Sequence, residues 1–182
     1  ELAQAISESL AGRTGIAELL PLSANELASA GFNTSKRNDM IFTGSMPRIY
    51  NSNIPPTRFY ADYFRTYIER DVRKILNVTA IDRFELFIKL LAGRVGQLIN
   101  RQALAADVGV SDKTIANWIS VLRASYIIFP LKPYYRNFGK RQTKAPKIYF
   151  FETGLVSYFL GIRSSEMVVT HLLVGIFFGY LL

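Results

Sequence analysis

Apolar residues recur every three to four positions in two parts of the chain, which is the spacing of one face of an α-helix. The first part starts at Phe59, and the second covers Ile81–Ala92. Charged side chains fill the opposite face of the first. Aromatic stripes at this spacing usually pack in a core. We therefore predict two core helices, whose apolar faces comprise Tyr60, Tyr63, Phe64, Tyr67, Ile68 and Val72, and Phe84, Phe87, Ile88 and Leu91.

The stretch LAADVGVSDKTIANWISVL, residues 104–122, has the pattern of a helix-turn-helix. Asn100 and Ser111 suit the N-cap positions of its two helices. Ala105 is small enough for a close helix crossing, and Gly109 permits the positive φ of the turn. The apolar positions that hold the helices together are Leu104, Val108, Val110, Ile115, Trp118, Ile119 and Leu122.

Two strand-like stretches follow, SYIIFPL at 125–131 and PKIYFFE at 146–152, with a polar, turn-forming segment between them. Helix, helix, turn, helix and then a hairpin is the element order of a winged helix. Before residue 59 we expect a short strand at 17–20, a helix over 24–30 capped by Ser23, and mostly loop over 33–58. The predicted fold class is α+β, mainly helical, with a winged helix-turn-helix and a basic β-hairpin wing.

The composition of the 182 residues, 49% hydrophobic and 13% aromatic, excludes an intrinsically disordered chain. The sequence has no cysteine and one histidine, His171, so we assign no catalytic residue and no metal ligand. The lack of cysteine fits a reducing compartment, and we expect a cytoplasmic protein. The apolar residues 172–182 fall short of the roughly 20 that span a bilayer. We expect no transmembrane segment and interpret this end as core; the alternative is a membrane-contacting tail.

The net charge of +8 is concentrated in one part of the chain. Residues 91–147 hold ten basic residues and two acidic ones, Asp107 and Asp112, whereas the remaining basic and acidic residues balance at 12 each. A basic region of this kind is typical of contact with nucleic acid. The excess therefore surrounds the predicted helix-turn-helix.

The exposed face of the second helix offers few groups for reading bases. Lys113 and Asn117 are candidate DNA contacts, and Arg123 lies near the far end of the helix. Asp112 at its start would repel phosphate, and no early arginine is placed for a bidentate guanine contact. Sequence-specific readout is therefore the weaker interpretation.

The predicted wing has more basic side chains. Arg136, Lys140, Arg141 and Lys144 alternate with aromatic residues and no acid, which suits phosphate contacts with some base stacking. Two alternatives remain open for this segment. It is either a solvated hairpin, or a surface that docks a partner protein or an acidic part of the same protein.

Several motifs in order resemble bacterial and archaeal AAA-superfamily ATP-binding proteins with a C-terminal domain of unknown function that contains a winged helix. They are SLAGR, LLPLSANEL, GSMPRIY, YADYFRTYIERDVRKI, the helix-turn-helix and KRQTKAPKIYFFETGL, spread over about residues 7–178. The resemblance implies a P-loop ATPase core that precedes this chain and binds ATP and Mg²⁺. The motif G-x-x-x-x-G-K-S/T is absent here, so we expect this chain alone to hold no cofactor and to hydrolyse no ATP.

The resemblance also implies roles for particular residues of the intact protein. Arg13 of SLAGR corresponds to an arginine that completes a γ-phosphate site, and its alternative role is to interact with a helix dipole. Pro47 of GSMP corresponds to a turn that contacts adenine, and its alternative is an ordinary turn. This chain has Glu152 where relatives often have Asp, and Gly179 where they usually have an acid, which puts a carried-over role for the C-terminal region in doubt.

The implied organisation has three parts: the end of an ATPase core and a linker at 1–58, a helical region with the winged helix-turn-helix at 59–151, and the start of a truncated C-terminal α/β region at 152–182. The leading functional hypothesis is that the winged helix couples the nucleotide state of the intact ATPase to a partner. The alternative is a winged-helix DNA-binding regulator that acts through the basic wing.

Overall fold

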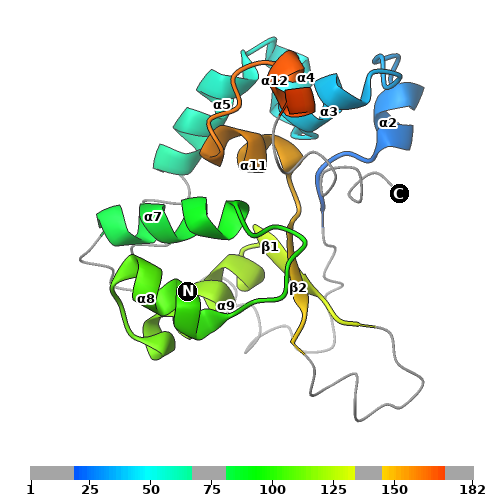
Figure 1. The fold of residues 1–182 in the computed structure, drawn as a ribbon. Helices are drawn as coiled ribbons and strands as arrows, with labels where there is room; N and C mark the ends of the chain where they lie inside the picture. Colours follow the sequence, from blue (N-terminus) through cyan, green and yellow to red (C-terminus); the bar gives the residue numbers. More distant parts are fainter. Residues whose placement is uncertain (1–18, 67–80, 134–144, 171–182) are drawn as a thin grey trace, which may run out of the picture.

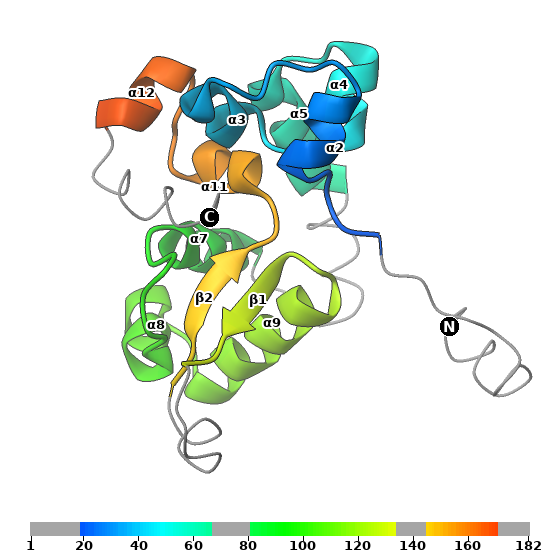
Figure 2. The same ribbon diagram turned by 90° about the vertical axis from the view of Figure 1, so that its right-hand side faces the viewer.

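A computed structural model describes residues 19–66, 81–133 and 145–170 of the chain (Figures 1 and 2). Within these residues the protein is mainly helical and has one antiparallel sheet of two strands, in agreement with the predicted α+β class. The helices are α2 (Ala24–Ser29), α3 (Arg37–Thr43), α4 (Pro47–Ser52), α5 (Pro56–Tyr63), α7 (Ile81–Ala92), α8 (Arg101–Val108), α9 (Asp112–Ala124), α11 (Thr153–Phe159) and α12 (Ser165–Thr170), and the strands are β1 (Ile128–Leu131) and β2 (Lys147–Phe150).

The elements form two halves that share one core. Helices α2 to α5, α11 and α12 form the upper half in Figure 1. Helices α7 to α9 and the two-stranded sheet form the lower half. Helix α11 packs on α3, α5 and α7, so a segment from the end of the described chain lies among helices from its start. Buried side chains from Ile41 to Val168 belong to a single cluster.

Trp118 of α9 is the centre of the packing between α7 and α9. Its ring meets that of Phe84 at 5.2 Å and 90°, and lies 5.3 Å from the ring of Phe87. All three side chains are buried, and so are Ile88 and Leu91. The prediction that the aromatic stripe of residues 81–92 faces the core is confirmed.

The ends of α8 and α9 follow the capping signals in the sequence. The side chain of Asn100 accepts a hydrogen bond from the N–H of Ala103 at 3.0 Å, and that of Ser111 accepts one from Thr114 at 3.1 Å. Gly109 ends α8 with φ 74°, which is the left-handed conformation that glycine adopts at low cost. The predicted caps and turn are confirmed.

The two strands pair with Ile128 opposite Phe150 and Phe129 opposite Tyr149. Ile128, Ile148 and Phe150 are buried on the inner face of the sheet. β1 starts three residues later than predicted because residues 125–127 complete the end of α9, where the N–H of Ile127 donates to the carbonyl of Leu122. Of the segment predicted to form the wing, residues 134–144 lie outside the described residues.

The prediction that residues 33–58 are mostly loop is wrong. This segment contains α3, α4 and the start of α5, and each helix buries an apolar residue: Ile41, Ile49 and Tyr60. The prolines that suggested loop occupy first-turn positions of α4 and α5, where a missing N–H costs nothing. These short helices depend on tertiary packing, which a local pattern does not reveal.

At the N-terminal end of the described chain, the predicted helix is confirmed, whereas the described part of the predicted strand is not a strand. Ser23 caps α2 in a reciprocal capping box with Glu26, as predicted from the N-cap preference. Leu19 and Leu20, expected in a strand, pair with no strand, and the rest of that expected strand lies outside the described residues. Among the described residues, every helix is too short or too polar to cross a bilayer.

Candidate nucleic-acid interface

One face of α9 is exposed and carries the predicted contact residues. Lys113, Asn117, Ser120 and Arg123 are all exposed and follow one another at spacings of three and four, so they share one side of the helix. Ile115, Trp118, Ile119 and Leu122 are buried on the other side. The structure thus brings together three of the candidate residues, Lys113, Asn117 and Arg123, on one accessible surface.

Both acids of the basic region are paired with arginines. Nε of Arg101 at the start of α8 lies 3.5 Å from a carboxylate oxygen of Asp112 at the start of α9, and Arg94 binds the carboxylate of Asp107. These are surface ion pairs, which stabilise a fold little. Their effect is on local charge, because each places a guanidinium beside one of the two acids of the basic region.

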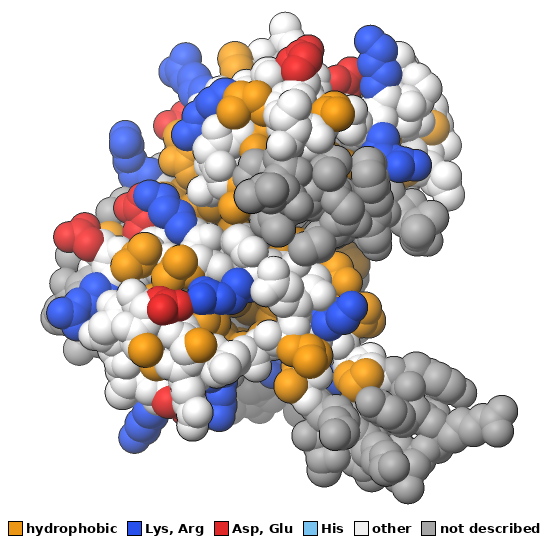
Figure 3. Space-filling model, viewed as in Figure 1, with side chains coloured by type: hydrophobic (Ala, Val, Ile, Leu, Met, Phe, Trp, Pro, Cys, Tyr) orange, Lys and Arg blue, Asp and Glu red, His pale blue; other side chains and the backbone are white. Residues whose placement is uncertain are grey.

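Figure 3 shows acidic and basic side chains beside one another over the half of the molecule formed by α7 and α8. The sequence alone predicts that Asp112 repels phosphate. The structure places the guanidinium of Arg101 against it, and this contact joins two residues on different helices. Only the fold could reveal the pairing, although Arg101 lies eleven residues before Asp112 in the sequence.

The outer face of the sheet carries a continuous row of aromatic rings that sequence analysis did not single out. In this aromatic row, Tyr126 lies 6.0 Å from Phe151, Phe151 lies 4.8 Å from Phe129, and Phe129 stacks on Tyr149 at 5.7 Å, all measured between ring centroids. Their signal in the sequence was the alternation of IIFPL and KIYFF, which we had used only to predict strands.

The remaining candidates for contacts with the nucleic-acid backbone lie outside the described residues. They are Arg136, Lys140, Arg141 and Lys144 of the predicted wing. Arg13, the candidate for the γ-phosphate site, also lies outside them. The strands before and after the wing segment, β1 and β2, are described. Because they pair with each other, the basic segment between them begins and ends at the same end of the sheet.

The motifs GSMPRIY and FFETGL meet at a buried carboxylate. The N–H of Ser45 donates to both oxygens of Glu152, at 2.9 and 3.0 Å, and the N–H of Gly154 donates to one of them at 3.1 Å. Burial raises the pKa of Glu152 to about 7, although the hydrogen bonds from backbone N–H groups oppose this rise. Glu152 is also the N-cap of α11. Its position is explained by folding, because it joins the first half of the chain to α11.

Pro47 is exposed at the first position of α4, and its nucleotide-binding role remains a prediction. The turn before it is packed by the protein itself. Gly44 has φ 75°, and a Cβ there would overlap Glu152 and the phenol of Tyr60. The hydroxyl of Tyr50 donates to the carbonyl of Gly44 at 2.6 Å.

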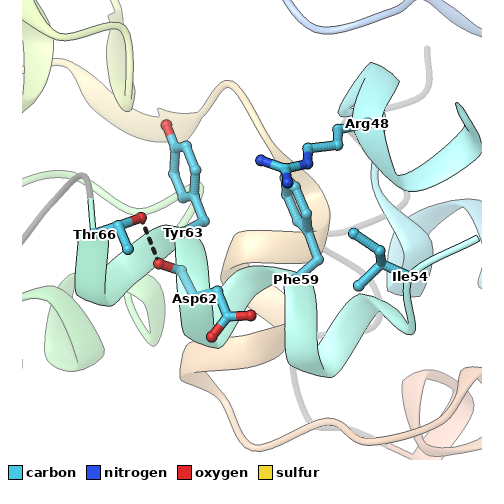
Figure 4. Close-up of a pocket in the computed structure, with 6 residues that line it drawn as sticks. All are labelled: Arg48, Ile54, Phe59, Asp62, Tyr63 and Thr66. Atoms are coloured by element: carbon cyan, nitrogen blue, oxygen red, sulfur yellow. Dashed lines mark hydrogen bonds between the residues drawn. The ribbon is translucent and has the colours of Figure 1, made fainter. Parts of the chain in front are cut away.

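A hollow of about 340 Å³ lies between α4 and α5 (Figure 4), and Arg48, which follows Pro47 in the sequence, lines it. The rings of Phe59 and Tyr63 stack at 6.0 Å, and the side chain of Arg48 reaches toward Phe59. Asp62 lines the same hollow, where its backbone carbonyl accepts a hydrogen bond from Thr66 at 2.7 Å.

The donor set of this hollow does not fit a nucleotide triphosphate. It offers one guanidinium, that of Arg48, and a carboxylate, that of Asp62, which repels phosphate. Phosphate sites usually use backbone N–H groups at a helix start, but the N-cap Pro55 and the first residue Pro56 of α5 have none, so this helix start offers fewer donors. The described residues also contain no cluster of three His, Asp or Glu side chains that could hold a metal ion. We assign no nucleotide to the hollow between α4 and α5.

Comparison with known proteins identifies relatives without an established function. Residues 34–166 match the model of a family described as Domain of unknown function (DUF8612). The chain is 31% identical over 159 residues to Uncharacterized protein Rv2008c of Mycobacterium tuberculosis and, equally, to Uncharacterized protein Mb2031c of Mycobacterium bovis. These alignments cover 86% of this chain and 35% of each relative, so the chain spans about a third of the relatives' length. No solved structure matches it.

Proposed function

The chain belongs to the family described as Domain of unknown function (DUF8612), and we propose that it is the nucleic-acid-binding module of a longer ATP-binding protein. In this proposal α7, α8 and α9 with the sheet form a winged helix-turn-helix. Its exposed α9 face and its basic wing contact the phosphate backbone. The observation that carries the proposal is the pairing of Asp107 and Asp112 with Arg94 and Arg101.

That pairing matters because it weakens the repulsion that the two acids would exert on a phosphate beside α9. Two acids among ten basic residues would oppose a polyanion if they faced it unpaired. With an arginine beside each acid, Lys113 and Arg123 stand on a surface where the carboxylates of the basic region are partly compensated. A surface of this kind attracts phosphate irrespective of base sequence, through the release of counterions.

α9 has no arginine near its start. We therefore propose that the module contacts the nucleic-acid backbone rather than the base edges. Asn117 is the side chain on this face with the geometry to pair with adenine, and Lys113 offers a point charge. Phosphate contacts fix position, and base contacts fix sequence. We therefore propose binding with little sequence preference.

The association with ATP rests on the resemblance to AAA-superfamily proteins and on the length of the relatives. The chain spans 35% of each mycobacterial relative, which leaves room for a P-loop core elsewhere in such proteins. ATP and Mg²⁺ would act there, with Arg13 and Pro47 as the residues of this chain nearest the nucleotide. The module would couple the nucleotide state to nucleic acid, in line with residues 1–58 being the end of an ATPase core.

Duplex binding measured by fluorescence anisotropy over a range of salt concentrations tests the proposal. For a protein that contacts phosphates, log K falls linearly with log salt, by about 0.9 for each contact. The double variant Lys113→Glu/Arg123→Glu, and separately the triple variant Lys140→Glu/Arg141→Glu/Lys144→Glu, should weaken binding and flatten this slope by about two or more. Arg58→Glu on α5 is the matched control, because it reverses an exposed charge in the other half of the molecule.

Two results would contradict the proposal. Binding that is absent at low salt for both duplex and single-stranded DNA, or that does not respond to salt, excludes a phosphate-contacting module. If the same variants instead disturb assembly with a protein and leave DNA binding unchanged, the basic surface belongs to a protein-docking adaptor. The ATP part is tested separately in the full-length protein, whose ATP turnover should rise on addition of DNA.

A further inference from the structure

Tyr126 occupies a backbone position at the end of α9 that normally favours glycine. After the C-cap Ser125, Tyr126 has φ 53°, the left-handed conformation. The N–H of Ile127 donates to the carbonyl of Leu122 at 2.9 Å, and the N–H of Tyr126 donates to that of Arg123 at 3.1 Å. These two bonds define a Schellman ending, whose left-handed residue is usually glycine because a side chain there is strained.

The strained residue carries an exposed ring. Tyr126 is 46% exposed, so much of the ring is accessible to a ligand. A glycine at this position would relieve the strain. A strained residue with an exposed aromatic side chain is typical of a position that contacts a ligand. The ring is also the first member of the aromatic row.

The aromatic row lies where an ordinary sheet would be polar. Outward-facing positions of a small antiparallel sheet are usually hydrophilic, but here Phe129 and Tyr149 are stacked at an interplanar angle of 19° and only half-buried. Leu131, the next outward residue of β1, is 51% exposed. The outer face of the sheet is therefore apolar along the length of β1.

A hollow of about 410 Å³ lies between this face and the end of α9. Arg123 and Ser120 line it from the helix, Tyr126 from the turn that follows, Phe129 from β1, and Phe151 from the position after β2. No acid is among its lining residues. A guanidinium beside aromatic faces suits a ligand that has both a planar ring and a negative charge, since arginine binds phosphate and aromatic faces stack on bases.

We propose that the aromatic row and Arg123 form a site for the unpaired bases of single-stranded nucleic acid. This inference rests on the proposed nucleic-acid-binding function and adds the strand state of the ligand. In a duplex the faces of the bases are covered by their neighbours, so only unpaired bases can stack on the rings of Phe129 and Tyr126. β1 leads directly into the basic stretch from Lys132 to Lys147, whose excess charge fits a polyanion better than an apolar protein surface.

Two ligands that differ only in their bases test the inference. One is a labelled oligothymidylate of about 15 nucleotides, and the other is an abasic oligomer of the same length and charge. The wild-type chain should bind oligothymidylate at least about fivefold more tightly than the abasic strand, because stacking adds to the phosphate contacts. Equal affinity for the two would overturn the inference. No binding of either would instead overturn the underlying proposal.

Tyr126→Gly is the variant that separates a binding role from a structural one. Glycine suits the left-handed position, so the melting temperature should rise, while the preference for oligothymidylate over the abasic strand should fall. Phe129→Leu, which keeps an apolar side chain but removes a ring, should reduce the same preference. Asn53→Gly, at the other non-glycine residue with positive φ in the described chain, and Phe32→Leu, at an exposed ring of the other half, are matched controls and should leave it unchanged. A Tyr126→Gly chain with its full preference for bases overturns the site.

Discussion

The backbone N–H of Ser45 lies 2.9 and 3.0 Å from the two carboxylate oxygens of Glu152, across 107 residues of sequence. Glu152 also accepts a hydrogen bond from Gly154, and its side chain is almost fully buried, at 3% exposure. The turn before α4 is thereby held against the start of α11. Because Glu152 lies between β2 and α11, this contact fixes the segment that links the two halves of the molecule.

The stability of the fold should decrease as the pH rises through neutrality. Burial raises the pKa of Glu152 from 4.5 to about 7, so between these values the folded chain binds more protons than the unfolded chain. The stability that the protonated Glu152 contributes is fully present below its pKa in the unfolded chain. It is lost as the pH rises past its pKa in the folded chain. The free energy of unfolding should fall by about 3 kcal/mol over this window. Urea titrations across it measure the change.

Glu152→Gln is the control for that titration. Glutamine keeps one oxygen acceptor for the N–H groups of Ser45 and Gly154 and does not titrate. The variant should be nearly independent of pH between 4.5 and about 7, apart from the slope that the other groups contribute. A wild-type chain whose stability increases over the same window would show that the carboxylate is charged in the fold.

Gly44→Ala should destabilise the protein strongly. The residue has φ 75°, and a Cβ would overlap both the carboxylate of Glu152 and the phenol of Tyr60. Conformational strain of about 1 kcal/mol adds to overpacking of about 1–3 kcal/mol. Gly109→Ala provides the comparison, because Gly109 has φ 74° and nothing within 4 Å of its Cβ position. It should lose only the conformational part; equal losses in the two variants would exclude tight packing at Gly44.

Trp118→Ala should lower the free energy of unfolding by about 3–5 kcal/mol, since it removes a large buried ring from between α7 and α9. The ring contacts Phe84 and Phe87 and is 4% exposed. Trp118→Phe keeps most of the apolar volume and should lose less. Circular dichroism during urea denaturation measures both variants without depending on the indole. A small loss for Trp118→Ala would indicate that α9 is not anchored through this residue.

The parts of the fold that could be predicted are those specified by neighbouring residues. The bounds of α7, the N-caps Asn100 and Ser111 and the turn at Gly109 all follow from signals within a few positions. Helices α3 and α4 could not be predicted in this way. Their six or seven residues are too few to show periodicity, and they are stabilised by packing Ile41 and Ile49 into a core built from distant segments.

The same distinction applies to the candidate site, where some features follow from the local sequence and others from the fold. The exposure of Lys113, Asn117 and Arg123 follows from helical periodicity, and the sequence predicted it. The pairing of Arg101 with Asp112 depends on how α8 crosses α9. The position of the Tyr126 ring depends on a left-handed backbone conformation. Tyrosine seldom adopts this conformation, so the sequence does not predict it.

Asp112→Asn should increase the affinity for nucleic acid. Asp112 is partly exposed at the first turn of α9, and its removal frees the guanidinium of Arg101 while it deletes a negative charge from the end of the contact face. The gain should be about two- to fivefold at low salt and should shrink as salt screens the charges. The helix loses a favourable charge at its N-terminus, so stability should fall by about 0.5 kcal/mol. Anisotropy at two salt concentrations, with Asp82→Asn at the start of α7 as the matched control, measures the effect. Unchanged affinity of the Asp112 variant would mean that the face of α9 does not approach phosphate. Weaker binding would mean that Arg101 makes its contact only while the ion pair holds it in place.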